Sequence, residues 1–222
     1  MAAKAAGSGG GRRKRAPADP EAKIVDAALR LAALQGWADT SLADIAAEAK
    51  VPLAELRHRF AGKSAILRAF LRRVDEQVLA GSDPALADEP VKDRLFDVLM
   101  RRLDALEPHR DALAAIGREL QREPPALACF LAGPFQRSMR WMLEAAQVPP
   151  WGALQPLQVK GLGVLYLSVY RVWLGDEGTD KAKTMAALDK ALSRADSVIA
   201  MLRRGPRRRR GEGVEAAEAP DV

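Results

Sequence analysis

Cysteine, aromatic residues and β-branched runs are all scarce in this sequence. The 222 residues contain one cysteine, Cys129, so no disulfide can form within a single chain and a reducing compartment is expected. There are two tyrosines, four tryptophans and five phenylalanines, and the β-branched runs typical of strands are missing. Alanine and leucine dominate instead, which predicts an all-α protein.

Long apolar segments are missing as well. The longest nearly polar-free run, residues 161–170, is about half of the roughly 20 residues that a membrane-spanning helix needs. The basic N-terminus is not followed by the apolar region of a secretory signal. We therefore expect a cytoplasmic protein with no integral membrane association.

The residues of common catalytic and metal sites are few. The two histidines, His58 and His109, lie far apart in the chain, and no Cys/His ligand set exists for a metal. The glycines near the N-terminus do not stand between a strand and a helix, so they do not predict a phosphate-binding loop. The sequence predicts no catalytic residue, no metal, no cofactor and no enzymatic activity.

Positive charge is concentrated at the two ends of the chain. Residues 1–16 hold five basic residues and no acidic one, and residues 203–222 hold six arginines against four acids, whereas the net charge of the whole chain is +6. The body is therefore nearly neutral, and the high isoelectric point alone does not indicate nucleic-acid binding. We expect a disordered basic arm at 1–18 and a disordered Arg-rich tail at 204–222. Each is either a nucleic-acid contact or a solvated tail, and for the tail anionic lipid is a further option.

Helical periodicity covers most of the remaining chain. Asp19-Pro20-Glu21 is a typical helix start, and Gly36 is a typical helix end. Ser41 and Asp44 predict a capping box, and Pro52 predicts the first turn of another helix over about 52–59. Further helices are expected from Lys63 on, and at about 91–106, 108–122, 125–147, 155–174 and 179–203, with Pro134 kinking or splitting the third of these five.

Two short helices with a tight turn between them occupy residues 41–63, the pattern of a helix-turn-helix. Ile45, Ala46, Leu56 and Phe60 would form its small core, with Ala46 small enough to admit the crossing helix. Any corner between two packed helices needs similar residues. The motif taken alone therefore leaves both interpretations open.

The sequence around this motif resembles that of a known family. Residues 21–70 contain "TSLADIAAEAKV" and then "LRHRFAGKSAIL", followed by a long helix, and this arrangement resembles the TetR family of one-component regulators. The resemblance implies an all-α, TetR-like fold with an N-terminal three-helix unit that binds DNA and a C-terminal helical bundle. In this chain the DNA-binding domain with its connecting helix would span 19–80. The ligand-binding and dimerisation domain would span 81–203.

The resemblance also implies a DNA-binding surface. It comprises Thr40, Ser41, Lys50, Leu53, Ala54, Glu55, Arg57, His58 and Lys63. The chain departs from the family in having Lys50 in place of a turn glycine and Arg57 in place of a tyrosine. Lys50 fits if it adopts a left-handed conformation, and Arg57 can bind a phosphate through a charged hydrogen bond. Glu55 is either an acceptor from a cytosine or a group that phosphates repel.

Aromatic residues cluster in the second half of the chain, where the family binds its ligands. We predict that an apolar small molecule is bound by Phe130, Phe135, Met139, Trp141, Tyr166, Tyr170 and Trp173, with Trp141 and Trp173 foremost. Ordinary core packing explains the same residues. Cys129, beside them, is expected to be an inert core thiol.

The helix at 155–174 is apolar nearly all round, so it needs cover on both sides. Gly161 and Gly163 permit close approach by another helix, and with 179–203 this helix would form a two-fold bundle in a homodimer. A symmetric dimer matches a palindromic operator in double-stranded DNA. The sequence thus predicts a regulator, a repressor, that senses a lipophilic molecule. The alternatives are a TetR-fold lipid-binding accessory protein of ubiquinone biosynthesis that does not bind DNA, and a dimeric interaction protein without a ligand.

Overall fold

The computed structural model describes residues 19–81 and 87–204, and these residues form helices and no strand. The expected all-α fold is confirmed. The basic arm at 1–18 and nearly all of the Arg-rich tail lie outside the described residues. The α-helices are α1 (Pro20–Gln35), α2 (Leu42–Ala49), α3 (Leu53–Arg59), α4 (Lys63–Ala80), α5 (Val91–Leu106), α6 (Arg110–Arg122), α7 (Pro124–Phe130), α8 (Gln136–Ala145), α9 (Gln155–Leu174) and α10 (Ala182–Arg204).

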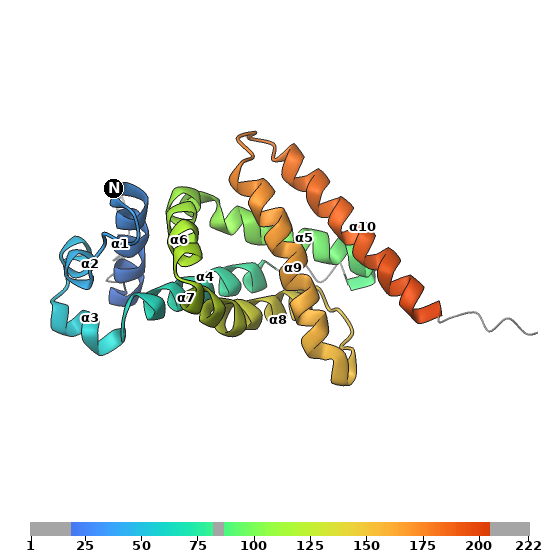
Figure 1. Cartoon of the computed structure of the whole chain (residues 1–222), viewed down its shortest axis with the longest axis horizontal. Helices are drawn as coiled ribbons and strands as arrows, with labels where there is room; N and C mark the ends of the chain where they lie inside the picture. The colour runs from blue at the N-terminus through green and yellow to red at the C-terminus, as the bar shows by residue number, and fades with distance from the viewer. Residues whose placement is uncertain (1–18, 82–86, 205–222) are drawn as a thin grey trace, which may run out of the picture.

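Helices α1, α2 and α3 form a compact unit at one end of the molecule, from which α4 runs into the remaining helices (Figure 1). Asp19 caps α1 by accepting from the Glu21 amide at 3.1 Å, with Pro20 at the first helical position. Gly36 ends α1 at φ 93, a backbone conformation that L side chains rarely adopt. The apolar faces meet in one buried core that includes Ile24, Ile45 and Leu56.

The second part of the chain packs α5 to α10 around the far end of α4. Helix α6 lies against α1, so this helix links the N-terminal unit to the rest of the protein, while α9 and α10 lie side by side at the opposite end (Figure 1). Pro134 splits the expected long helix, as predicted. A π-helical segment, Leu131–Phe135, carries Pro134 between α7 and α8, because proline cannot supply the amide that a continuous α-helix requires.

A buried ion pair joins three helices in the middle of the molecule. Arg102 of α5 donates from one terminal nitrogen to Asp75 Oδ1 of α4 at 2.5 Å, and the Ser138 hydroxyl of α8 donates to the same oxygen at 2.5 Å. Arg102 is only 1% exposed. A buried charge without its partner is strongly unfavourable, so this pair fixes the mutual position of α4, α5 and α8.

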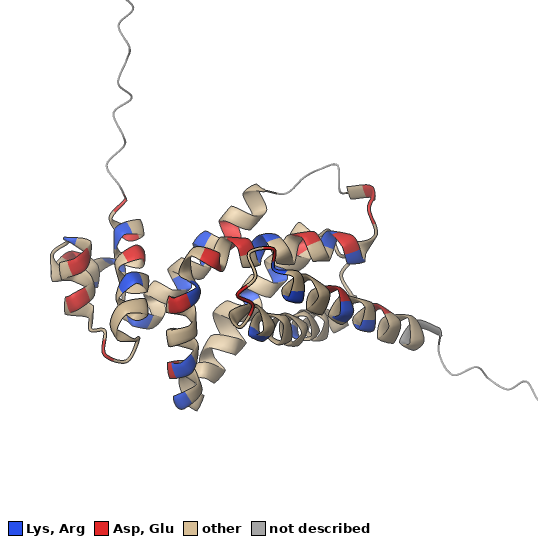
Figure 2. Ribbon diagram, turned by 90° about the horizontal axis from the view of Figure 1, so that it is seen from above, with Lys and Arg blue, Asp and Glu red and all other residues tan. Residues whose placement is uncertain are grey.

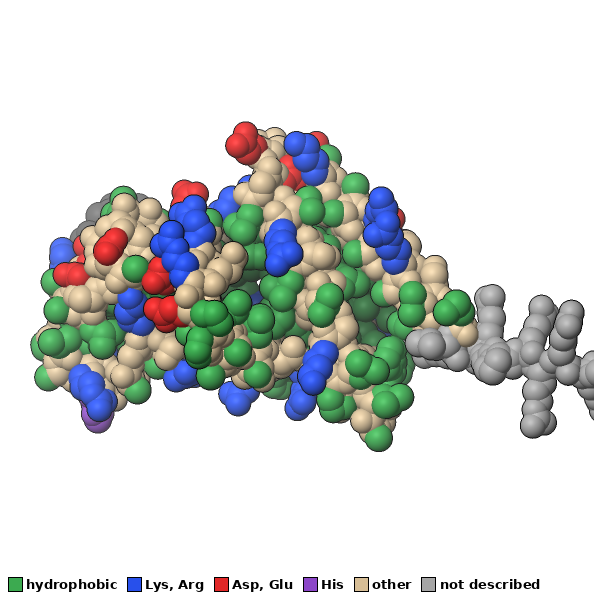
Figure 3. All heavy atoms as spheres, viewed as in Figure 1, with side chains coloured by type: hydrophobic (Ala, Val, Ile, Leu, Met, Phe, Trp, Pro, Cys, Tyr) green, Lys and Arg blue, Asp and Glu red, His purple; other side chains and the backbone are tan. Residues whose placement is uncertain are grey.

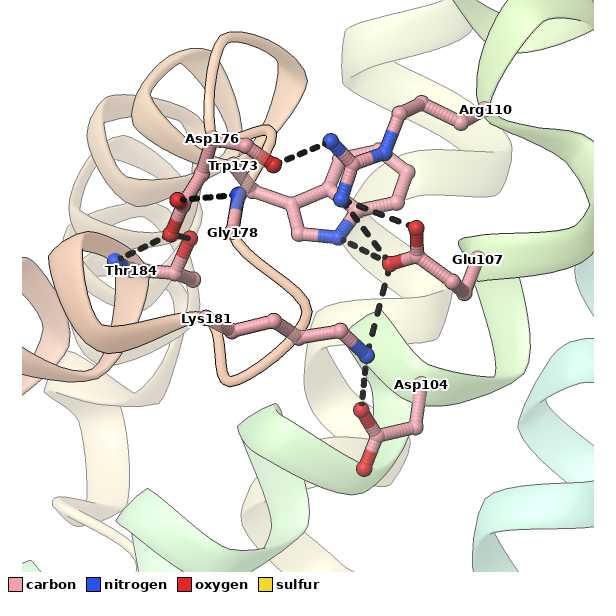
Figure 4. A network of polar contacts seen from close by, with 8 residues as sticks. All are labelled: Asp104, Glu107, Arg110, Trp173, Asp176, Gly178, Lys181 and Thr184. Atoms are coloured by element: carbon pink, nitrogen blue, oxygen red, sulfur yellow. Dashed lines mark hydrogen bonds and ion pairs between the residues drawn. The ribbon is translucent and has the colours of Figure 1, made fainter.

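A second polar network holds the start of α10 against the end of α5 (Figure 4). The Lys181 ammonium bridges Asp104, at 2.5 Å, and Glu107, at 3.3 Å. Arg110 donates to Glu107 and to the Asp176 carbonyl oxygen, and Asp176 accepts from both the amide and the hydroxyl of Thr184. Burial acts to raise the pKa of Glu107, but hydrogen bonds from Arg110, Trp173 and Lys181 outweigh it, and the pKa is lowered.

Charges of both signs are interspersed along the helices (Figure 2). None of the described helices is both long enough and apolar enough to span a lipid bilayer. One expectation about burial is wrong: Cys129 is exposed, and no residue of α7 belongs to the fully buried core.

Candidate nucleic-acid interface and ligand cavity

Helix α2 begins with a complete capping box. The Ser41 hydroxyl accepts from the Asp44 amide at 3.1 Å, and the Asp44 carboxylate accepts from the Ser41 amide at 2.9 Å. The Ser41 hydroxyl also donates to the Asp44 carboxylate at 2.6 Å, and this bond, together with the one from the Ser41 amide, lowers the pKa of Asp44, which keeps it ionised and able to cap. The capping box predicted from the sequence is therefore confirmed. It sets the angle at which α2 enters the N-terminal unit.

The turn between α2 and α3 depends on Lys50. This residue adopts the left-handed conformation, φ 55 and ψ 44, that a non-glycine residue needs at this position. The Lys50 amide donates to the Ala47 carbonyl at 3.1 Å, and the Val51 amide donates to the Ala46 carbonyl at 3.0 Å. Together the two bonds form a Schellman motif, which usually has glycine at its left-handed residue.

Helix α3 begins one residue later than expected. Pro52 is its N-cap residue, at φ −58 and ψ 141, and not part of the first turn. Leu56 is buried beneath the helix, whereas Arg57 and His58 are exposed, and basic side chains and a histidine project from this side of the molecule (Figure 3). At the start of α3, Leu53 is 51% exposed and Ala54 is also exposed.

Glu55 is paired within its own helix. Its carboxylate accepts from the Arg59 guanidinium at 3.2 Å, one helical turn away. The pair is exposed, so it is weak and free to rearrange. Arg59 offsets the negative charge of Glu55, which leaves Lys50, Arg57 and His58 to set the basic character of this surface.

The side chains of Thr40 and Lys63 are used inside the protein. Thr40 is 1% exposed and its hydroxyl donates to the Gly36 carbonyl at 2.7 Å, so in this conformation the hydroxyl is not free to bind a phosphate, whereas the sequence suggests a phosphate contact there. The Lys63 ammonium donates to the carbonyls of Trp37 and Thr40 and lies 4.7 Å from the centre of the Trp37 ring. Burial lowers the pKa of Lys63, and the charges of Glu119, Glu123 and Asp39 oppose this shift. Both residues secure the connection from α1 to α2.

A cavity of about 400 Å³ lies between α4, α5, α6, α7, the π-helical segment and α9. Its volume is in the range of small-molecule sites in proteins. The wall is mainly apolar, with polar groups at a few points. The residues that line it include Leu67, Arg102, Ile116, Phe135, Tyr166 and Tyr170.

The structure brings together four of the seven residues expected at a ligand site: Phe130, Phe135, Tyr166 and Tyr170 all line the cavity. The other three lie elsewhere. Trp141 is 48% exposed on the surface of α8, and Met139 is fully buried in the core. Trp173 is also buried, and its indole N–H donates to Glu107 at 2.9 Å (Figure 4). The expectation that Trp141 and Trp173 line the pocket is therefore wrong for this cavity.

Sequence reasoning missed Arg102 and the cavity face of α6. Arg102 falls on the same stripe as Val98, Leu99 and Leu106, and a charged residue on an apolar stripe indicates a buried polar partner. The cavity face of α6 could also be recognised from the sequence, because Leu113, Ile116 and Leu120 follow helical spacing. Across 19–81 and 87–204, no three His, Cys, Asp or Glu side chains come close enough together to hold a metal ion.

The glycines of α9 have different surroundings. A Cβ at Gly163 would lie 3.0 Å from the Phe135 ring, so this glycine permits close packing of α9 on the π-helical segment of the same chain. Gly163 is therefore not at an outer surface. The sequence suggests the opposite, that it faces a partner helix in a dimer. Gly161 is exposed, and a Cβ there meets no atom within 4 Å.

Comparison with known proteins agrees with the geometry. The family model described as "Bacterial regulatory proteins, tetR family" matches residues 24–70, which span α1 to the middle of α4. No curated protein matches the chain significantly. The chain is similar to the solved structure of a TetR transcriptional regulator from Nitrosomonas europaea ATCC 19718, with 27% identity, a TM-score of 0.67, and coverage of 81% of this chain and 99% of that one.

Two further solved structures share the fold. One is a TetR transcriptional regulator from Rhodococcus sp. RHA1, with a TM-score of 0.55, 18% identity, and coverage of 78% of this chain and 93% of that one. The other is a tetR-family transcriptional regulator from Streptomyces coelicolor, with a TM-score of 0.55, 19% identity, and coverage of 84% and 85%. Residues 24–70 therefore match the model of the tetR family, and the chain has an all-α fold similar to that of TetR-family transcriptional regulators.

Proposed function

We propose that the chain is a DNA-binding transcriptional repressor that acts as a homodimer and releases its operator when an apolar small molecule enters the cavity. The observation that carries the proposal is that α3, the second helix of a complete helix-turn-helix, exposes basic side chains. In this proposal residues 19–80 are the DNA-binding domain with its connecting helix, and residues 81–203 bind ligand and form the dimer.

The DNA contacts divide into two kinds. Leu53, Ala54 and Glu55 stand at the start of α3, where a recognition helix meets base edges in the major groove. Lys50 and Arg57 flank them and neutralise phosphates, which positions the helix without reading sequence. The Ser41 amide and hydroxyl are engaged in capping, so a phosphate near this helix end would bind through the next free amides of α2.

The dimer would form through the outer faces of α9 and α10. Apolar side chains are exposed along these two helices on the side shown in Figure 3. Val164, the central one on α9, is 72% exposed, and Gly161 stands one turn before it. The exposed apolar residues are Leu157, Val164 and Val172 of α9 and Met185, Val198 and Met201 of α10. Contiguous exposed apolar residues are typical of a protein interface.

The arrangement of α6 and α4 offers a physical route from cavity to DNA. Helix α6 lines the cavity with Leu113 and Ile116 and packs on α1 with its other face. Helix α4 lines it with Leu67 and Leu71 and leads directly from the N-terminal unit. A ligand that repositions either helix would change the separation of the two α3 helices in the dimer. It would weaken binding because the half-sites of a palindrome lie one DNA turn apart.

The lipid-binding alternative is not favoured by the comparisons, since the solved structures described above are transcriptional regulators. Footprinting of the purified full chain on fragmented genomic DNA tests the choice. A repressor protects a few sharp, palindromic segments, whereas a carrier or an interaction protein protects none above background. Arg57→Ala is the matched control, because it should weaken every footprint while leaving the fold unchanged.

A further inference from the structure

The cavity beside α6 and α9 has a mainly apolar interior and a polar opening. Only three of the described residues that line it are exposed to solvent: Arg118 and Gln121 of α6, and Arg171 of α9. Figure 3 shows basic side chains on both of these helices, with a hollow between them. The other lining residues are buried or half-buried, and apart from Arg102 and two tyrosines they are glycine or apolar. Positive charge is therefore placed at the opening of an apolar enclosure.

The charges of these two arginines are not compensated within the described part of the chain. Neither Arg118 nor Arg171 forms an ion pair with another residue of 19–81 or 87–204. Three and four residues before and after each arginine, where a helix places its side-chain neighbours, the sequence has no acidic residue. No acidic residue lines the cavity either. Both guanidinium groups are therefore available to a negatively charged ligand.

The interior of the cavity offers a charged group nothing comparable. Arg102 is 1% exposed, and its charge is compensated by Asp75 at 2.5 Å. A carboxylate that entered fully would lose its water and meet no uncompensated positive charge. At the opening the same carboxylate would keep part of its water and face two arginines. The cavity therefore favours a ligand with an apolar body inside and a negative headgroup at the opening.

We propose that the cavity binds a lipophilic monocarboxylate, with its carboxylate at the opening beside Arg118 and Arg171. Arginine suits this role because its planar guanidinium can donate two parallel hydrogen bonds to a carboxylate. Gln121 lies three residues after Arg118, on the same side of α6, and adds an uncharged donor. The inference rests on the proposed sensing function, because it names the class of molecule that would occupy the same cavity.

Three compounds with matched alkyl chains test the inference: decanoate, decanol and decylammonium, whose headgroups are negative, neutral and positive. Their binding to the full chain is measured by isothermal titration calorimetry at neutral pH, without DNA and below the concentrations at which they form micelles. We expect decanoate to bind at least about tenfold more tightly than decylammonium, because the arginines attract one headgroup and repel the other. Acetate, which has no apolar chain, should show no measurable binding, because an exposed ion pair alone is weak.

Arg118→Gln and Arg171→Gln each remove one positive charge from the opening. Each should weaken decanoate about fivefold, the upper end for an exposed ion pair, and should change the affinity for decanol by less than about twofold. Arg122→Gln and Lys160→Gln are the matched controls, because they remove an exposed charge from the same two helices at residues that do not line the cavity. Both controls should leave the affinity for decanoate within about twofold of the parent, since salt screens distant exposed charges.

A double variant, Arg118→Glu with Arg171→Glu, reverses the charge of the opening. It should bind decylammonium more tightly than decanoate, whereas its affinity for decanol should stay within about twofold of the parent. Because both side chains are exposed, thermal unfolding should show a melting temperature close to that of the parent. Retained decanol binding shows that the cavity is intact. If the double variant does not fold, the two single variants decide.

Several results would overturn the inference. They are no binding of decanoate by the parent protein, decanoate that binds no more tightly than decylammonium, and arginine variants that weaken decanoate no more than the two controls do. Equal losses of decanoate and decanol in those variants, or a folded double variant that still prefers decanoate, would overturn it as well. All these titrations are made without DNA, so they succeed or fail separately from the footprinting.

Discussion

Replacing Lys50 by glycine should stabilise the protein. Lys50 has a left-handed backbone at φ 55, where the Cβ of an L residue costs roughly 1–2 kcal/mol. Glycine avoids this cost but gives the unfolded chain more freedom, which offsets about 0.5–1 kcal/mol. The net gain in the free energy of unfolding is therefore about 0.5–1 kcal/mol, or up to about 4 °C in melting temperature for a chain of this size.

Lys50→Ala is the control for this substitution. Alanine keeps the Cβ and hence the backbone strain, so its free energy of unfolding should stay within about 0.5 kcal/mol of the parent. Urea unfolding at one fixed protein concentration measures both variants. If Lys50→Gly proves no more stable than Lys50→Ala, the left-handed turn does not strain Lys50 and the reasoning is wrong.

The same pair of variants separates charge from conformation in DNA binding. Both remove one positive charge next to α3, and both should lower the salt dependence of binding by about 0.9 log unit of affinity per log unit of salt. Their affinities for a footprinted duplex should fall alike. A loss confined to Lys50→Gly would mean that the rigidity of the turn, and not its charge, supports binding.

Three other changes probe the surface, the interface and the core. Arg57→Ala should weaken binding to all duplexes to a similar degree and reduce the salt slope by about 0.9, and an unchanged slope in salt titrations would remove Arg57 from the phosphate contacts. Gly161→Leu should convert the dimer to monomers in analytical ultracentrifugation without lowering subunit stability, whereas Gly163→Leu should lower the melting temperature because its side chain meets Phe135; the opposite pattern would place the interface elsewhere. Burial, assisted by Arg73 and opposed by Asp26, lowers the pKa of His109, whose ring packs edge-on against Phe70. The unfolded chain therefore takes up a proton first, so the free energy of unfolding should decrease as the pH falls below about 6.5, the pKa of an unperturbed histidine. His109→Gln should reduce this decrease, and an unchanged decrease in urea unfolding at several pH values would refute the assignment to His109.

Local signals predicted the helices well. The cap at Asp19, the capping box at Ser41 and the break at Pro134 each act within a few residues, so their effect can be read directly from the sequence. The boundaries of α5 and α9 agree with the expected 91–106 and 155–174. The start of α3 was misplaced by one residue, because a proline fits both an N-cap and the first helical position.

The side chains at the candidate sites were harder to predict, because their surroundings depend on helix rotation. Trp141 and Met139 lie two residues apart on α8, yet one is exposed and the other is fully buried. Trp173 is aromatic and buried, but its indole N–H bonds to Glu107, which lies 66 residues earlier in the chain. No local pattern shows such a partner. Asp75 and Arg102 pair across 27 residues of the chain, although their apolar neighbours gave a signal that each is buried.

In the proposed function, DNA and an apolar ligand bind to this chain at coupled sites. The direct measurement is a calorimetric titration of the full chain with an apolar compound that it binds, repeated in the presence of a saturating footprinted duplex. Because coupling between sites is reciprocal, we expect DNA to weaken ligand binding by the same factor by which ligand weakens DNA binding, typically about 5–150-fold. Coincident titration curves with and without the duplex would contradict this coupling.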